Sequence, residues 1–410
     1  MLTASFVGLA AIMVVIAVQM VQSHLFVRFF RRQPEAVPAG VAWPHAAVLL
    51  SVRGLDVGLP GCLDRLAALD YPSWELQVVV DHETDPAVHV IRRWTHGHPE
   101  IRVTTQFLSE ISPGAYLKTS AVRQCLRTIP AAVQVVVIVD ADTMVHPAWL
   151  KDMVGPMVGS RVGVVTGNRW YDPAAPGWGS LVRFVVNAHS VGPMYLMGAT
   201  WAGSLGFRRE VFDQPWFWER MLRTSSEESA IQESARRIGL DLVMQPNALL
   251  LNAGPIDVAS CFRFMRRQLL WTRLYHTQWW WIVAQAAALY GTLVAIGLGL
   301  VAAAWRGDGL AAASFGGTIV VVMGINLAFV EYMHRLVSER MRRTGNLVAP
   351  PIGLRTRLRL LAALTPALVV HTWATFAAAV AREVSWSGIR YRVEPPDQLR
   401  LVEYRPVIRP

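Results

Sequence analysis

The chain has 410 residues, is 53% hydrophobic and carries a formal net charge of +10, almost all of it from arginine. Its three cysteines, Cys62, Cys125 and Cys261, are odd in number and far apart, which excludes a disulfide framework and predicts reduced thiols. The sequence has no zinc-ligand pattern and no basic stripe with interleaved aromatic residues, so we expect no nucleic-acid partner. The arginines instead cluster beside apolar segments, which favours contact with an anionic membrane surface.

Residues 1–32 are predicted to form an N-terminal transmembrane anchor. The apolar run 6–26 is long enough to cross about 30 Å of hydrocarbon. A signal peptide is the alternative, but this run is longer than a signal core and has no positively charged start. Arg28, Arg31 and Arg32 follow it, so the positive-inside rule places the next domain in the cytoplasm.

Residues 45–256 have the pattern of an α/β domain. Short apolar runs, as expected of strands buried on both faces, alternate with stretches of helical spacing. This alternation predicts a mixed, mainly parallel sheet, whose ligands gather at the carboxyl ends of the strands. The predicted strands are 46–54, 76–81, 101–105, 133–140 and 161–167.

Two aspartates, Asp140 and Asp142, stand at the end of the strongest predicted strand. At this edge of the sheet they could hold a hard divalent cation, Mg²⁺ or Mn²⁺, that bridges the two phosphates of a nucleotide-sugar. A turn that caps the next helix is the alternative, because D-x-D alone is common. We predict that Asp142 binds the metal and that Asp140 binds the donor.

Three further charged residues are candidates for donor binding. Asp81 ends the second predicted strand and could accept hydrogen bonds from the base or the ribose. Lys118 precedes a predicted helix and Arg53 follows the first strand. Both could neutralise a phosphate, or both could be ordinary surface charges. Glu83 and Asp85 are expected to lie in a solvated turn.

A pair of carboxylates begins a predicted helix in the segment 224–240. Glu227 and Glu228 stand where one of them could deprotonate an acceptor hydroxyl, as direct displacement at a sugar carbon requires. From the local sequence alone, the simpler interpretation is an acidic first turn that interacts favourably with the helix dipole.

Residues 257–278 are predicted to form an interfacial amphipathic segment directly before the membrane helices. The segment is basic and aromatic. One interpretation is a helix at the membrane surface whose charged side chains extend to water. The other is a segment that closes over the donor with arginine and tryptophan contacts.

Residues 279–382 are predicted to contain about three membrane helices, at 279–305, 310–332 and 360–380. An arginine-rich loop, expected in the cytoplasm, lies between the second and the third. Three full spans after a cytoplasmic domain would place the basic tail, residues 383–410, outside. A proline interrupts the last stretch, so we suspect that this stretch re-enters or lies in the interface.

Six segments of the chain stand in a recognisable order, namely RGLD (53–56), LDYPSWELQVVVDHETDPA (69–87), LKTSAV (117–122), DAD (140–142), WAGSLGFRREVFD (201–213) and WSGIRY (386–391). Together they resemble the ceramide glucosyltransferase family of inverting membrane glycosyltransferases with a GT-A (Rossmann-like) fold. The resemblance implies that Asp81 contacts the nucleotide and that Lys118 takes the place of the family's lysine. It also implies that Glu228 is the catalytic base, at a position where the family has aspartate. The resemblance further implies an acceptor-binding or closing segment at Arg267, Gln268 and Trp271. This segment departs from the family's motif because an arginine position is occupied by Leu270.

These observations predict a hexosyltransferase that moves a hexose from a nucleotide-sugar, such as a UDP-sugar, to a membrane lipid. The resemblance implies glucose as the sugar and ceramide or another hydroxyl lipid as the acceptor. The predicted location is the cell (inner) membrane, with several spans and a cytoplasmic catalytic domain. A processive polysaccharide synthase is the alternative with the same catalytic parts. An inert membrane scaffold or a transporter subunit is the alternative of another class.

Overall fold

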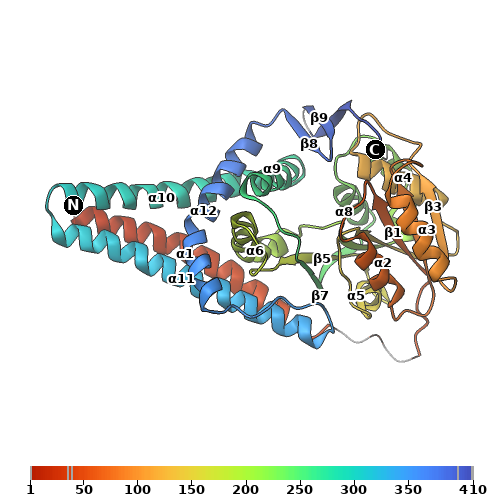
Figure 1. The fold of residues 1–410 in the computed structure, drawn as a ribbon, viewed down its shortest axis with the longest axis horizontal. Helices are drawn as coiled ribbons and strands as arrows, with labels where there is room; N and C mark the ends of the chain where they lie inside the picture. The colour runs from red at the N-terminus through yellow and green to blue at the C-terminus, as the bar shows by residue number, and fades with distance from the viewer. Residues whose placement is uncertain (1, 35–36, 38–39, 395–396, 408–410) are drawn as a thin grey trace.

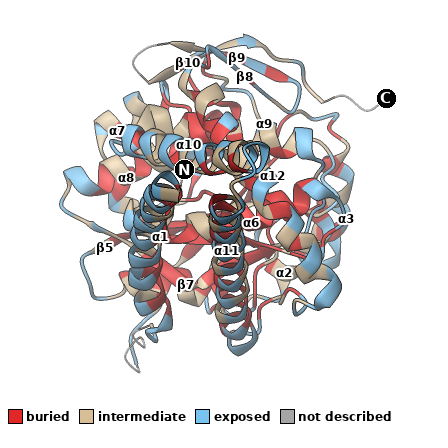
Figure 2. Ribbon diagram, turned by 90° about the vertical axis from the view of Figure 1, so that its left-hand side faces the viewer, coloured by how far each residue is buried: buried red, intermediate tan, exposed pale blue. Residues whose placement is uncertain are grey.

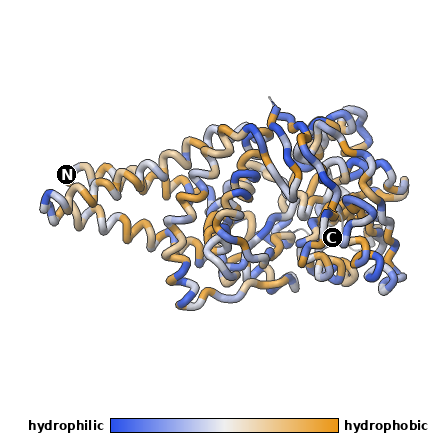
Figure 3. The backbone as a smooth tube through the Cα atoms, turned by 45° about the horizontal axis from the view of Figure 1, so that its top comes forward, coloured by the Kyte–Doolittle hydropathy of each residue, from blue (hydrophilic) through white to orange (hydrophobic). Residues whose placement is uncertain are grey.

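The computed structural model describes residues 2–34, 37, 40–394 and 397–407. It has two visibly different parts. Three long helices project to one side, and an α/β part lies at their other end (Figure 1). The tube in Figure 3 is mostly hydrophobic along the projecting helices and mixed in the α/β part.

The α/β part is built on a seven-stranded sheet in the order β3-β2-β1-β4-β6-β5-β7. Neighbouring strands are parallel except at β6, which runs antiparallel to both β4 and β5. This confirms the predicted mixed, mainly parallel sheet; β6 and β7 are additions to the predicted strands. The strands are β1 (Ala46–Val52), β2 (Trp74–Val80), β3 (Val103–Phe107), β4 (Val135–Asp140), β5 (Val162–Tyr171), β6 (Ser204–Arg208) and β7 (Asp241–Asn252).

Helices cover both faces of the sheet because successive side chains of a strand point to opposite faces. In β1, Val48 and Leu50 pack with α2, α3 and α5, whereas Ala47 and Leu49 pack with α4, α7 and α8. All four side chains are fully buried. The helices are α2 (Leu59–Ala67), α3 (Ala87–Gly97), α4 (Leu117–Thr128), α5 (Trp149–Val154), α6 (Trp178–Leu196), α7 (Pro215–Met221) and α8 (Glu227–Arg237), with short 3₁₀ turns at Gly155–Met157 and Arg209–Val211.

Three apolar helices form the projecting bundle: α1 (Leu2–Arg31), α10 (Trp279–Trp305) and α11 (Gly309–Arg343). They pack on one another through a small core that includes Ile12 and Phe315. Their outer faces carry large apolar side chains. Figure 2 shows that these faces are exposed on the helices that point toward the viewer. Together with α12, these are four helices within the described residues that are long and apolar enough to cross a membrane.

The arginines predicted to lie in a loop between the second and third apolar stretches are instead helical, the first four on α11 and Arg355 and Arg357 on α12 (Leu354–Ala379). Helix α11 continues to Arg343, and its last turns bury Val337 and Met341 against the α/β part. Arg340 donates from Nη1 to the carbonyl of Phe30, 2.7 Å away. The helix therefore extends beyond its apolar stretch because the second half packs on protein.

Helix α12 (Leu354–Ala379) contains Pro366 without ending there. It packs mainly on α6 and on α9 (Val258–Tyr275), and it runs across the base of the bundle in Figure 1. This course favours the interfacial alternative that the charge pattern left open for the last apolar stretch. Helix α9 forms where the amphipathic segment was predicted, and Asp257 caps its first turn by accepting from Ser260 N.

The basic tail is folded, which composition alone did not predict. It forms an antiparallel sheet of β8 (Glu383–Trp386), β9 (Ile389–Glu394) and β10 (Gln398–Glu403). Ser387 and Gly388 make the two-residue turn between β8 and β9, and both have positive φ, as a type I′ hairpin requires. Ile389 and Tyr391 are fully buried while the arginines beside them point outward. This alternation with period two is the strand signal that the arginine content conceals.

Candidate active site

The charged centre of the site lies at the carboxyl end of β4. Lys118 Nζ, at the start of α4, is 2.5 Å from Asp140 Oδ1. Asp142 Oδ2 accepts a hydrogen bond from Asn252 Nδ2 at 3.0 Å. Lys118 and Asp140 are 22 residues apart, and they meet because β4 and the start of α4 reach the same edge of the sheet.

The two aspartates differ in how well their charge is balanced. Burial alone would raise the pKa of Asp140, but Lys118 lowers it below its ordinary value. Burial raises the pKa of Asp142, and the charge of Asp140 raises it further. Asp142 is therefore a carboxylate that a cation would stabilise. Among the described residues no group of three or more His, Cys, Asp and Glu side chains surrounds a metal position. This donor set fits Mg²⁺ or Mn²⁺ held by one or two carboxylates and by substrate phosphates.

The predicted carboxylate pair stands at the first turn of α8 and faces the same centre. Ser226 caps this helix by accepting from Ser229 N. Glu228 Oε1 accepts from Ala202 N at 3.3 Å, and Glu228 Oε2 accepts from Ser226 Oγ at 2.8 Å. The Glu228 carboxylate is thus held at both oxygens, which fixes its direction.

Glu227 is buried and belongs to the same charge network. It accepts from Thr119 Oγ1 at 2.9 Å and lies 3.4 Å from Lys118 Nζ. Burial and the neighbouring Glu228 raise the pKa of Glu227 to about 7. Burial alone would lower the pKa of Lys118, but Asp140, Glu227 and Glu228 raise it above its ordinary value. Lys118 is therefore a permanent cation among three carboxylates.

The second predicted donor pair, Arg53 and Asp81, meets at the carboxyl ends of β1 and β2. Arg53 Nη1 donates to Asp81 Oδ2 in a buried ion pair. The prediction that Asp85 lies in a solvated turn is wrong. Asp85 is buried and accepts from Gly54 N at 2.7 Å and from Ala87 N at 2.9 Å. It fixes the turn after β1, while Glu83 is exposed as expected.

The predicted closing residues lie on α9, and only some of them face this centre. Arg267 is half-buried and interacts electrostatically with Asp140. Its guanidinium lies 5.7 Å from the centre of the Phe264 ring. Trp271 packs edge-on against Tyr116, with ring centroids 5.4 Å apart. Gln268 is half-buried, and its carbonyl accepts from Thr272 Oγ1 at 3.1 Å. Leu270 is buried in the core, which explains why a hydrophobic residue stands at this position.

Two arginines of the site were missed in the sequence. Arg169 lies on β5 with its guanidinium 4.9 Å from the Trp201 ring, and it feels the charges of Asp140 and Asp142. Arg183, on α6, lies 4.1 Å from the Tyr171 ring. Arg169 was not identified as a site residue because β5 was predicted to end at residue 167, two residues before it.

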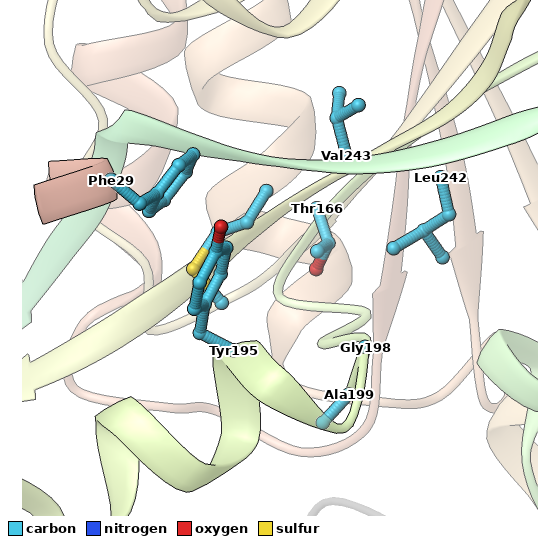
Figure 4. Close-up of a pocket in the computed structure, with 8 residues that line it drawn as sticks. Phe29, Thr166, Tyr195, Gly198, Ala199, Leu242 and Val243 are labelled. Carbon is cyan, nitrogen blue, oxygen red and sulfur yellow. The ribbon is translucent and has the colours of Figure 1, made fainter. Parts of the chain in front are cut away.

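An apolar cavity of about 170 Å³ lies between the end of α1, the end of α6 and the strands β5 and β7 (Figure 4). Phe29 comes from α1 and stacks on Tyr195 of α6 at 4.2 Å between ring centroids. Gly198 and Ala199 belong to the loop that continues to Ala202, the backbone partner of Glu228. The remaining lining residues are Thr166 of β5 and Leu242, Val243 and Met244 of β7.

A mixed, mainly parallel sheet with carboxylates at its strand ends, joined to four apolar helices among the described residues, is the GT-A architecture that the sequence predicted. The sequence matches glycosyl transferase family 21 over residues 7–399, and the chain belongs to this family. The resemblance seen in the motif order is thereby confirmed. The protein is a hexosyltransferase, which excludes the inert scaffold and the transporter subunit.

The fold is similar to that of a mannosyltransferase from Pyrobaculum calidifontis in complex with GDP-Man and Mn²⁺. The two chains are 19% identical, the match covers 88% of this chain and 99% of that one, and the TM-score is 0.52. A glucosyl-3-phosphoglycerate synthase from Mycobacterium tuberculosis, in complex with Mn²⁺ and uridine-diphosphate-glucose, is 17% identical. That match covers 54% of this chain and 75% of the synthase, with a TM-score of 0.35.

Proposed function

We propose that this enzyme moves a hexose from a nucleotide-sugar to the hydroxyl group of a membrane lipid, with inversion at the sugar carbon. The observation that carries the proposal is the position of Glu228. Its carboxylate is oriented by Ala202 N and Ser226 Oγ, and it stands beside the Lys118–Asp140 pair. A base and a phosphate-binding cation thus face one space, as a single displacement requires.

In the proposed reaction, the acceptor oxygen attacks the anomeric carbon of the sugar while Glu228 takes the hydroxyl proton. The bond between that carbon and the donor phosphate breaks, and its electron pair leaves with the nucleoside diphosphate. Lys118 and Arg267 neutralise the charge that develops on the leaving group. Asp81 and Arg53 bind the nucleotide base of the donor, and Asp140 also contacts the donor.

A divalent cation, Mg²⁺ or Mn²⁺, would be held by Asp142 and would supply positive charge to the diphosphate. The raised pKa of Asp142, caused by burial and by Asp140, supports this assignment because it marks an unbalanced negative charge. The presence of Mn²⁺ in the mannosyltransferase structure agrees with it.

A lipid acceptor fits the surroundings of Glu228. The apolar cavity is lined by Phe29, near the end of α1, and by Ala199, which lies three residues before Ala202, the backbone partner of Glu228. We assign this cavity to a hydrocarbon chain of the acceptor, with the chain in the cavity and the hydroxyl group at Glu228. Ceramide and glucose, which the family resemblance implies, are the first acceptor and sugar to test.

The proposed location is the cell (inner) membrane, with the catalytic domain on the cytoplasmic face. Arg28, Arg31 and Arg32 lie at the end of α1 that adjoins the α/β part. The arginines in the last turns of α11 lie at the same end of the bundle. Both sets satisfy the positive-inside rule with one orientation.

The test is transfer of labelled sugar by the purified protein in liposomes that contain ceramide, diacylglycerol or a polyprenol phosphate. Each liposome receives one radiolabelled donor, UDP-glucose, UDP-galactose or GDP-mannose, with Mg²⁺ or Mn²⁺. We expect label in the lipid extract, and loss of that label for Glu228→Gln. Label that stays in high-molecular-weight polymer would instead establish a processive polysaccharide synthase. Label only in free sugar would contradict the lipid acceptor.

A further inference from the structure

The last described residues of the chain, 404–407, lie on the base-binding end of the site. Asp81 Oδ1 accepts from Tyr404 Oη at 3.0 Å, and Asp81 Oδ2 accepts from Val407 N at 3.1 Å. Arg53 Nη2 donates to the carbonyl of Arg405 at 2.8 Å. Both members of the Arg53–Asp81 pair are therefore engaged by a segment more than 320 positions away in the sequence.

The small β8–β10 sheet holds this segment in place. Leu401 N, on β10, donates to the carbonyl of Pro113 at 2.8 Å, and Tyr391 Oη accepts from Leu117 N at 3.0 Å. Arg53 Nη2 also donates to the carbonyl of Ser387 in the β8–β9 turn. The segment 404–407 continues directly from β10, so its path over the site is set by an anchored sheet.

Little room for a nucleotide base is left beside the Arg53–Asp81 pair while the segment contacts it. The remaining space, lined by Arg53, Asp81, Lys118 and Trp386, has a volume of about 40 Å³. This is enough for about three water molecules and far too little for a pyrimidine ring. A base can bind to Asp81 here only after the segment moves.

The contacts of the segment match those that a uracil ring would make. Uracil presents one imide N–H between two carbonyl oxygens, and the segment presents the peptide N–H of Val407 and the peptide carbonyl of Arg405. In both cases the carboxylate of Asp81 receives a hydrogen bond and the guanidinium of Arg53 donates one. A peptide and a uracil base would therefore compete for the same pair.

We propose that residues 404–407 act as a built-in competitor of the donor nucleotide and must leave the Arg53–Asp81 pair before a uridine nucleotide binds. The inference rests on the proposed function of that pair. It makes donor affinity depend on the fraction of molecules in which the segment is released. A segment that is bound nine-tenths of the time weakens apparent affinity about tenfold.

The test compares three forms of the full protein in detergent: the chain ending at Glu403, the chain ending at Val407, and the intact chain. A fourth form replaces residues 404–407 by Gly-Ser-Gly-Ser and keeps the chain length. Binding of UDP with Mg²⁺ is measured by titration calorimetry. We expect the chain ending at Glu403 and the Gly-Ser form to bind UDP about tenfold more tightly than the other two. Tyr404→Phe, which loses one of the contacts with Asp81, should fall between them.

Equal UDP affinity in all forms, or weaker binding after the segment is removed, would overturn the competitor role and leave the proposed donor site standing. Weaker binding would identify the segment as a wall of the nucleotide site. No binding of UDP by any form, with or without the segment, would instead count against the proposed donor site itself. Val407→Cys, labelled with a fluorophore, gives a second readout: UDP should increase the rotational mobility of the label if the segment is released, and an unchanged or lower mobility would contradict the release.

Discussion

The two strands that flank β1 both end in aspartate, and the two aspartates have opposite surroundings. Asp81, after β2, is buried and accepts hydrogen bonds from an arginine, a tyrosine and a backbone amide of its own chain. Asp140, at the end of β4, has Lys118 as its bonded cation, and its neighbour Asp142 has one amide partner. The end of the site at Arg53 and Asp81, the closed end, is therefore occupied by protein contacts. The end at Asp140 and Asp142, the open end, keeps unbalanced negative charge.

This difference separates recognition from chemistry. At the closed end, Asp81 offers a hydrogen-bond acceptor and Arg53 offers a donor. This pair can recognise a neutral base, and a peptide can make the same hydrogen bonds. The open end collects Lys118, Glu227 and Glu228 around Asp140, and its net charge suits a diphosphate with a metal ion. Substitutions at the open end should therefore change the rate of the reaction, and those at the closed end should change donor binding.

The largest expected effect is that of Glu228→Gln. Without the base, we expect kcat to fall about a thousandfold, because general-base catalysis contributes about 10² to 10⁴ in rate. UDP affinity should stay as in the unchanged protein, because Glu228 lies at the open end. Glu233→Gln, one and a half turns further along α8 and paired with Arg237, is the matched control. Weakened UDP binding with an unchanged kcat would reverse the assignment of the two ends.

Asp142→Asn and Asp81→Asn form a matched pair across the comparison. We expect Asp142→Asn to lower kcat about a hundredfold and to raise the Mn²⁺ concentration needed for half-maximal rate, because it removes a metal ligand. Asp81→Asn should leave that Mn²⁺ concentration unchanged. Rate measurements over a range of Mn²⁺ concentrations distinguish the two. A shift of similar size in both variants would mean that the metal site extends to Asp81.

Much of the open end could be predicted from the sequence because its signals are local. β1, β2 and β4 are buried on both faces and therefore appear as uninterrupted apolar runs, and the aspartates follow directly. The meeting of Lys118 with Glu227 could not be predicted in this way. These residues are 109 positions apart, and only the packing of α4 and α8 on one face of the sheet brings them together.

Arg169 shows a second kind of failure. The glycine at 167 suggests the end of a strand, yet β5 continues to Tyr171. A Cβ at Gly167 would lie 2.3 Å from the carbonyl oxygen of Ala248 and 2.7 Å from Ser204 Oγ. Glycine is required there by the close approach of neighbouring strands, at a register shift in the pairing of β5 with β7. Gly167, a residue type that commonly ends strands, thus lies inside β5, and the half-buried Arg169 beyond it was not predicted.

The apolar cavity tests whether the acceptor reaches the open end from the membrane. Ala199→Phe and Val243→Phe each place a ring in the cavity and should raise the KM for the lipid acceptor roughly tenfold, because contacts with one or two methylene groups are lost. UDP affinity and metal dependence should not change. Leu222→Phe, at a side chain that is 39% exposed, is the control for added bulk. Unchanged KM for the lipid in both cavity variants would exclude this cavity as the chain site.

The last expected effect is a pH dependence of stability alone, not of the reaction, and it comes from Glu227. Its pKa is raised to about 7 in the folded protein by burial and by Glu228, above an ordinary value of 4.5. The folded state therefore holds this proton more tightly than the unfolded state. As pH rises from about 4.5 to about 7, the free energy of unfolding should fall by up to about 3 kcal/mol through this group. The glutamine in Glu227→Gln does not titrate. The melting temperature of this variant, relative to that of the unchanged protein, should therefore rise from pH 5 to pH 8. Glu233→Gln should show no such rise. A constant difference across this range would mean that Glu227 is ionised throughout and that its pKa is not raised.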